Sequence, residues 1–237
     1  MSRIAAAGAF VVSLDSTINI ALPAMAASFA VPPERMRWVI IAYVFTYAIT
    51  SFAGGAWADR AGHGRVFAAG LAVSALAFLL AGLATDFGWF LAARVVQGLG
   101  GGLVYGTAPG IVTAAAAPQA RGRALGVMSA AIAVGYCVGP LMAGALVDGF
   151  GWRAVFHVRV PMALVVLAGA LVVLRGHRAQ AAQRLVAARD ILRARLLWAG
   201  ALAFLANAGI FASGCWPASI SSRCAASTPR PRGYCSC

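Results

Sequence analysis

Seven stretches of this chain are each about 20 residues long, strongly apolar and nearly free of charge. A hydrocarbon core about 30 Å thick needs about 20 apolar residues of helix to cross it. Inside that core every backbone polar group must bond within the protein, so such stretches form helices. We therefore expect an all-α integral membrane protein with spans at Ile4–Ala27, Met36–Trp57, Val66–Thr85, Gly88–Ala114, Ala124–Val147, Ala154–Leu174 and Leu196–Gly214.

The composition excludes most soluble functions. Of the 237 residues, 62% are hydrophobic and only 11% are charged, whereas about a quarter of the residues of a soluble domain are charged. A globular enzyme is therefore not expected. The formal charge of +13 would favour nucleic-acid binding in a soluble protein. Here the charges fall between the apolar stretches, which is the pattern of membrane topology.

The arginines predict how the chain is oriented. Arg35, Arg37 and Arg153 fall on one side of the expected membrane. Seven others fall on the opposite side, at Arg3, Arg60, Arg65, Arg121, Arg123, Arg175 and Arg178. Cytoplasmic loops carry the excess of positive charge, so we expect a multi-pass protein of the inner cell membrane with its N-terminus in the cytoplasm.

The start of the chain resembles a signal peptide at Arg3 and Ala24–Ala26. Asp15 and Asn19 interrupt the apolar region that a signal peptide needs, so we expect the first span to be retained.

The chain changes character after residue 174. We divide it into a six-helix bundle (1–174), a basic cytoplasmic linker (175–195), a seventh span (196–214) and an aberrant tail (215–237). The linker repeats alanine and leucine at helical spacing, which suits either a helix on the inner membrane face or an exposed tether. The tail contains Cys215, Cys224, Cys235 and Cys237 without paired C-x-x-C spacing. We interpret the tail as a disordered segment that is translated after the original reading frame is lost near Gly214. An ordinary disordered tail and a metal or redox site are the alternatives.

One short loop carries the clearest motif. The segment from the end of the second stretch to the start of the third contains Gly55, Asp59, Arg60, Gly62 and Arg65. It resembles the loop between helices two and three of the major facilitator superfamily, a family of secondary transporters. The resemblance implies a conformational-switch loop, in which the aspartate engages a helix end of the second half of the transporter. Setting topology through its arginines is the plainer interpretation, and both can hold.

The first stretch places Asp15 in the middle of a membrane span. A carboxylate there costs about 2.5–3.5 kcal/mol on insertion scales, which makes it a functional candidate. The segment Leu14–Pro23 resembles the signature of drug:proton antiporters in the superfamily, but it is one residue shorter after Ile18. One residue fewer rotates the remainder of the helix by about 100°, which affects Asn19, a candidate for the cavity. A structural hydrogen bond to a neighbouring helix is the alternative for Asp15.

The segment Arg94–Gly102 resembles the family's R-x-x-Q-G-x-G signature in the fourth helix. Arg94 and Gln97 are three residues apart and share a helix face. A buried guanidinium needs a partner, and Asp15 is the best candidate. The resemblance ties this arginine to proton coupling, so we expect Asp15 and Arg94 to form the coupling pair, with Gln97 and Tyr43 as further cavity candidates. The alternative is an arginine that snorkels to the interface.

The fifth stretch contains Gly135, Gly139, Pro140 and Gly144. The first two glycines form a small-xxx-small face for close helix approach, and the proline favours a kink. This segment resembles the antiporter signature of the family, which implies a hinge linked to export.

The start of the sixth stretch, Gly151–Pro161, also resembles the family pattern, but Arg159 stands where asparagine is usual. An arginine at this depth is costly unless it snorkels.

Together these resemblances imply the N-terminal half of a major facilitator, built from two inverted three-helix repeats, plus about one further helix. The implied function is proton-driven antiport that exports drugs or other small hydrophobic molecules. We expect no enzyme activity, no cofactor, no metal site and no nucleic acid. The expected partners are the lipid bilayer, a hydrophobic or cationic substrate, and a missing C-terminal half or a second copy. A nontransporting membrane remnant and an exporter of a metabolite or antibiotic remain open, as does a parent of twelve or fourteen helices.

Overall fold

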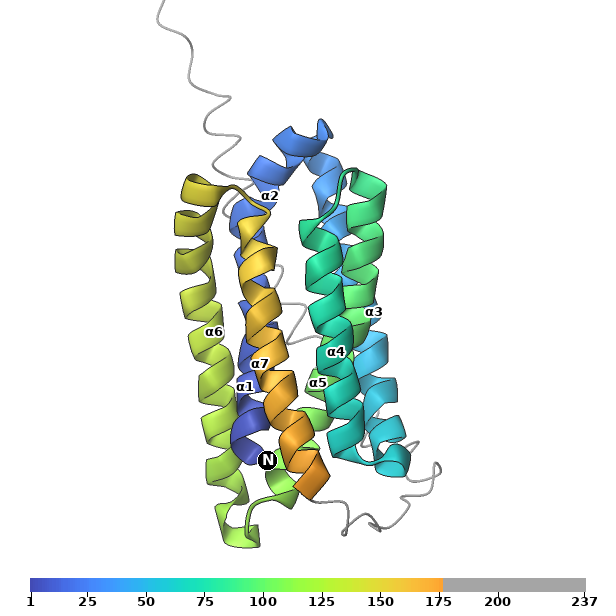
Figure 1. The fold of residues 1–237 in the computed structure, drawn as a ribbon, viewed down its shortest axis with the longest axis vertical. Coiled ribbons are helices and arrows are strands. Elements are labelled where there is room, and N and C mark those ends of the chain that lie inside the picture. The colour runs from blue at the N-terminus through green and yellow to red at the C-terminus, as the bar shows by residue number, and fades with distance from the viewer. Residues whose placement is uncertain (177–237) are drawn as a thin grey trace, which may run out of the picture. The chain divides into compact units, whose positions relative to one another are not determined.

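Six helical segments of the described residues are long and apolar enough to cross a membrane. The computed structural model describes residues 1–176, and its helices run side by side along their length (Figure 1). The first span consists of α1 (Ser2–Ser13), η1 (Leu14–Ser16) and α2 (Thr17–Phe29). The others are α3 (Pro33–Ala61), α4 (His63–Gly82), α5 (Phe87–Ala114), α6 (Arg121–Phe150), which follows the short η2 (Pro118–Ala120), and α7 (Ala154–Gly176).

The all-α membrane fold and six of the predicted spans are confirmed. The predicted seventh span, the basic linker beyond Gly176 and the cysteine-rich tail lie outside the described residues. The predicted end of the third span at Thr85 is wrong, because α4 ends at Gly82 and the chain turns there. Asp86 then caps α5 by accepting a hydrogen bond from the Trp89 backbone N–H at 2.8 Å, which satisfies one of the free donors of a helix start.

The first span is not one uninterrupted α-helix. The 3₁₀ turn η1 separates α1 from α2 and contains Asp15. A 3₁₀ turn has three residues per turn instead of 3.6, so side chains leave it in different directions from those of a regular α-helix. Leu14 and Asp15 are both buried in this turn. The turn therefore holds the mid-membrane carboxylate inside the bundle.

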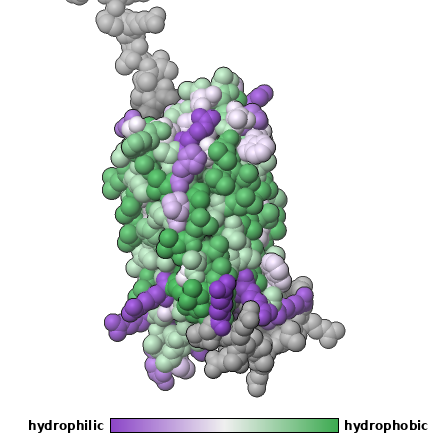
Figure 2. Space-filling view, viewed as in Figure 1, coloured by the Kyte–Doolittle hydropathy of each residue, from purple (hydrophilic) through white to green (hydrophobic). Residues whose placement is uncertain are grey.

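The outside of the bundle is apolar. Large hydrophobic side chains on α3, α6 and α7 are highly exposed, for example Phe45 at 66%, Leu141 at 78% and Val165 at 72%. Figure 2 shows hydrophobic residues over the middle of one face and hydrophilic residues gathered toward its two ends. Exposed apolar surface on this scale marks contact with membrane or protein rather than with water.

Glycines allow α5 to pack between α3 and α4. A Cβ atom added at Gly98 would lie 2.8 Å from the Tyr43 carbonyl oxygen of α3, and one at Gly102 would be as close to the same helix. On the opposite side, a Cβ atom at Gly100 would lie 2.9 Å from the Gly70 carbonyl oxygen of α4. The glycine run after Gln97 thus fits the backbone of α5 against both neighbours, as small residues do in membrane helices.

The small-residue face of α6 packs on the first span. A Cβ atom at Gly135 would overlap the Ser13 hydroxyl oxygen, and one at Gly139 would lie 2.5 Å from the Ser16 hydroxyl oxygen. Gly144, by contrast, has no atom outside its own helix within 4 Å of an added Cβ. Two glycines of the predicted hinge therefore have partners within these six spans, on either side of Asp15.

We predict that Gly135→Ala lowers the apparent unfolding temperature of the purified chain in detergent, since overpacking a tight contact costs about 1–3 kcal/mol. Gly144→Ala is the matched control on the same helix and should leave that temperature unchanged or raise it slightly. Tryptophan fluorescence during heating measures both. Equal unfolding temperatures for the two variants would contradict this packing.

Candidate functional site

Three predicted residues meet in the interior of the bundle. Arg94 of α5 donates from Nη1 to Asp15 Oδ1 and from Nη2 to Asp15 Oδ2, both at 3.0 Å. Gln97 donates from Nε2 to Asp15 Oδ1 at 2.6 Å and accepts from Arg94 Nη1 at 2.6 Å. Their exposed fractions are 5% for Asp15, 1% for Arg94 and 2% for Gln97. The bidentate geometry is the strongest form of an arginine–carboxylate pair, and Arg94 does not snorkel.

A second arginine reaches the same carboxylate. Arg159 of α7 donates from Nη1 to Asp15 Oδ1 at 3.1 Å. Its side chain is completely enclosed instead of reaching the interface. Its remaining donors, Nε and Nη2, have no hydrogen-bond partner within the described residues. Arg159 is the residue that sequence reasoning failed to assign to the site, and its replacement of the usual asparagine was the only signal.

The centre formed by Asp15, Arg94, Gln97 and Arg159 contains two guanidinium groups and one carboxylate. Among the described residues no other acidic side chain is buried. Arginine stays protonated in proteins, so this buried centre carries one unbalanced positive charge while Asp15 is ionised.

Aromatic rings lie against both guanidiniums. The Cζ atom of Arg94 is 4.3 Å from the centroid of the Tyr43 ring, and that of Arg159 is 4.3 Å from the centroid of the Phe78 ring. Tyr43 in turn stacks on Tyr47, with ring centroids 5.8 Å apart. Cation–π contacts of this kind stabilise cations that have lost water. Tyr43, a predicted cavity residue, therefore contacts the centre through Arg94, and its role in a cavity stays a prediction.

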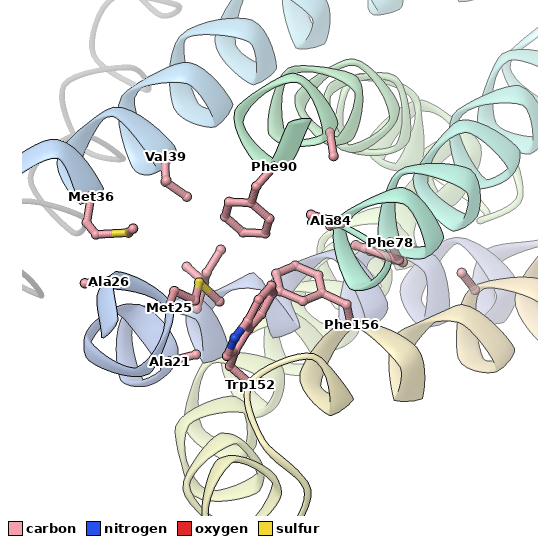
Figure 3. Packing of buried hydrophobic residues seen from close by; sticks show 14 of the residues in the cluster. Ala21, Met25, Ala26, Met36, Val39, Phe78, Ala84, Phe90, Trp152 and Phe156 are labelled. Carbon is pink, nitrogen blue, oxygen red and sulfur yellow. The ribbon is translucent and has the colours of Figure 1, made fainter. Parts of the chain in front are cut away.

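An aromatic cluster lies one helical turn from the centre. Phe90 precedes Arg94 by four residues, and Phe156 precedes Arg159 by three; their ring centroids are 5.6 Å apart. Trp152 packs against Phe90 at 5.7 Å, and Figure 3 shows these rings together with residues of α2 and α3. Phe90 and Phe156 are fully buried, so aromatic side chains enclose this end of the centre.

The remaining predicted residues lie apart from the centre. Asn19 on α2 is half-buried and makes no hydrogen bond to Asp15, Arg94 or Gln97. Of the two candidates in the segment Leu14–Pro23, Asp15 belongs to the centre and Asn19 does not.

The predicted switch loop joins α3 to α4. Its Gly62 has φ of 93°, a conformation that favours glycine. Asp59 Oδ1 lies 3.5 Å from His63 Nε2 one turn later. Gly55 faces α5, where an added Cβ would lie 3.5 Å from the Gly106 carbonyl oxygen. Arg60 and Arg65 are exposed. The role of this loop as a conformational switch stays a prediction.

Comparison with known protein families shows which family this chain belongs to. The family model of the Major Facilitator Superfamily matches residues 4–228. The chain belongs to this superfamily. It is therefore a multi-pass membrane protein from a family of transporters, with six helices in the described residues that can span a membrane.

Relatives with assigned names cover most of the described residues. Multidrug resistance protein Stp of Mycobacterium tuberculosis is 36% identical over 163 residues, which cover 68% of this chain and 30% of Stp. Cephamycin export protein CmcT of Amycolatopsis lactamdurans is 38% identical over 171 residues, which cover 71% of this chain and 35% of CmcT. This chain thus spans about a third of the length of these relatives.

A solved structure shares the fold. The superfamily proton:xylose symporter XylE, bound to 6-bromo-6-deoxy-D-glucose, aligns with a TM-score of 0.62 at 17% identity. The alignment covers 72% of this chain and 43% of the symporter chain. At this identity the likeness supports the arrangement of the helices and carries no information on cargo.

Proposed function

We propose that this chain is part of a proton-coupled secondary transporter that exports drugs or other small hydrophobic molecules. Membership of the superfamily and the names of Stp and CmcT support export as the reaction class. The observation that carries the proposal is the buried Asp15–Arg94 pair, which joins the first and fourth spans. Ionisable groups this deep in a membrane protein mark ion and substrate pathways.

In the proposed cycle Asp15 is the proton acceptor. A proton bound to its carboxylate removes the negative charge that Arg94 and Arg159 share. Both guanidiniums then lose their ionic partner, and the helices that carry them favour a different packing. A proton gradient drives the change of state because the two states differ in their affinity for the proton. No cofactor is needed for this step, and we propose no enzymatic reaction.

The transport pathway also needs a second set of helices. Half-transporters of this architecture rock against each other around a shared site. We propose that a C-terminal half or a second copy packs against the exposed apolar surface of the six described spans. The activity belongs to that assembly within a lipid bilayer, and its cargo is a small hydrophobic molecule.

The distribution of arginines supports one orientation of the chain. One end of the bundle contains the N-terminus of the chain. Among the described residues, the arginines near this end are Arg3, Arg60, Arg65, Arg121, Arg123 and Arg175, and those near the opposite end are Arg35, Arg37 and Arg153. We propose that the N-terminal side faces the cytoplasm of an inner cell membrane, by the positive-inside rule.

We predict that Asp15→Asn abolishes proton-driven export. The chain is joined to the second half of Stp and expressed in bacteria that lack their own efflux pumps, and accumulation of a panel of hydrophobic dyes is measured. Cells with the unchanged aspartate should accumulate less dye than empty-vector cells, and Asp15→Asn should remove the difference. Asp148→Asn, an exposed carboxylate of α6, is the matched control and should export normally. Normal export by Asp15→Asn at equal membrane abundance would exclude Asp15 from coupling.

We predict that the two ends of the bundle react differently with an impermeant maleimide in intact cells. In a background without native cysteines, Thr85→Cys between α4 and α5 should be labelled from outside. Gln119→Cys in η2 should be labelled only after lysis. Both side chains are exposed in the structure, so accessibility does not separate them. The reverse labelling would invert the proposed topology.

A further inference from the structure

The two arginines of the centre differ in the partners that remain to them when Asp15 is neutral. Arg94 also donates from Nη1 to the Gln97 side-chain oxygen at 2.6 Å and from Nε to the Val39 carbonyl oxygen at 3.4 Å. Arg159 donates to Asp15 from Nη1, while its Nε and Nη2 are buried without a hydrogen-bond partner within the described residues. A buried charge that loses its partner is strongly destabilising. Neutralisation of Asp15 therefore acts mainly on Arg159.

Helix α7, which carries Arg159, is attached in different ways to its two neighbours. It lies beside α1 on one side and α4 on the other (Figure 1). Toward α4, Arg153 at the start of α7 donates to the Ala84 carbonyl oxygen at 2.9 Å, and the Arg159 guanidinium lies against the Phe78 ring. Toward the first span, the hydrogen bond among the described residues runs from Arg159 to Asp15. A proton on Asp15 thus removes the ionic contact with the first span and leaves the contacts with α4 intact.

The other groups around Asp15 do not replace that contact. Its charged neighbours are Arg94 from α5 and Arg159 from α7, and the ionisable side chains of α4 lie in its first turn, at His63 and Arg65. The tyrosines that interact with the carboxylate are Tyr43 of α3, Tyr105 of α5 and Tyr136 of α6. A phenol is neutral near pH 7, so among the described residues the two arginines alone respond strongly to a change in the charge of Asp15.

Arg159 lies near one end of its helix. Helix α7 begins at Ala154, so at 1.5 Å per residue Arg159 is about 8 Å along the helix axis from that start. Long arginine side chains near a helix end extend to the membrane interface, where the charge meets water. A modest displacement of α7 therefore gives the Arg159 guanidinium a favourable alternative to its buried position.

We propose that Arg159 is a positioning residue that makes α7, together with α4, the part of the bundle that moves when Asp15 takes up a proton. The ionised carboxylate holds α7 against the first span. When the carboxylate is neutral, Arg94 keeps its acceptors on α5 and α3, whereas Arg159 leaves the first span for the interface and α7 moves with it. The inference rests on the proposed function, since it specifies how the bundle responds to the coupling proton.

The test uses Asp15→Asn as a neutral form of the carboxylate at constant pH, because the reactivity of thiols itself changes with pH. Two cysteine pairs are introduced into the full chain, with its native cysteines replaced by serine, in lipid nanodiscs. Ile4→Cys with Gly169→Cys joins α1 to α7, where a Cβ atom added at Gly169 would lie 3.8 Å from Ile4 Cδ1. Gly64→Cys with Leu174→Cys joins α4 to α7, where a Cβ atom added at Gly64 would lie 2.5 Å from Leu174 Cδ2. A short bifunctional thiol reagent reports the proximity of each pair.

We expect Asp15→Asn to lower cross-linking of the α1–α7 pair severalfold and to leave the α4–α7 pair unchanged, which also shows that the chain stays folded. Addition of Arg159→Asn should restore the α1–α7 cross-link, because the charge that drives the displacement is gone. Addition of Arg159→Lys keeps that charge and should not restore it, which separates the charge of the side chain from its packing.

An unchanged α1–α7 cross-link in Asp15→Asn, equal losses in both pairs, or restoration by Arg159→Lys as complete as by Arg159→Asn would overturn the inference. Displacement of α7 together with normal dye export by Asp15→Asn would overturn the proposed function alone. Loss of export with an unchanged α1–α7 cross-link would overturn this inference alone.

Discussion

The ion pair between Asp15 and Arg94 is the interaction on which the rest of this structure depends. A lone carboxylate or guanidinium in the middle of a membrane span is costly, and the cost falls when the two share hydrogen bonds away from lipid. The first and fourth spans must therefore lie close enough for a bidentate contact. Gln97 supports the same pair from one turn along α5, so three hydrogen-bonded side chains fix the relative position of two spans.

Small residues make that approach possible. Gly98 and Gly102 bring α5 against α3, and Gly100 brings it against α4. Gly135 and Gly139 bring α6 against the first span on either side of Asp15. The glycine-rich signatures thus have a plain physical purpose in this fold, which is to allow backbones to approach around a charged centre. Close-packed contacts adapt poorly to small shifts, so we expect a change in the charge of that centre to shift these helices.

Sequence reasoning predicted the features that depend on local pattern. The length of apolar stretches indicated six spans, and the three-residue spacing of Arg94 and Gln97 indicated a shared face. The choice of Asp15 as the partner of Arg94 followed from the scarcity of other acids. Features that depend on packing between distant spans were missed. The contact of Arg159 with Asp15 requires α7 to lie beside the first span, and no local pattern specifies that neighbour. The 3₁₀ turn at Asp15 and the end of α4 at Gly82 are likewise set by packing and turn geometry rather than by hydropathy.

The central claim is that Asp15 neutralises one buried arginine while Arg159 leaves a surplus positive charge. The most direct measurement is the apparent unfolding temperature of the full chain carrying Asp15→Asn, Arg159→Asn or both. Asp15→Asn leaves two guanidiniums without an anion and should lower the temperature strongly, since breaking a buried pair costs about 3–5 kcal/mol. Arg159→Asn should leave it unchanged or raise it, and the second substitution should recover part of the loss caused by the first. A decrease in Arg159→Asn as large as that in Asp15→Asn would contradict the account.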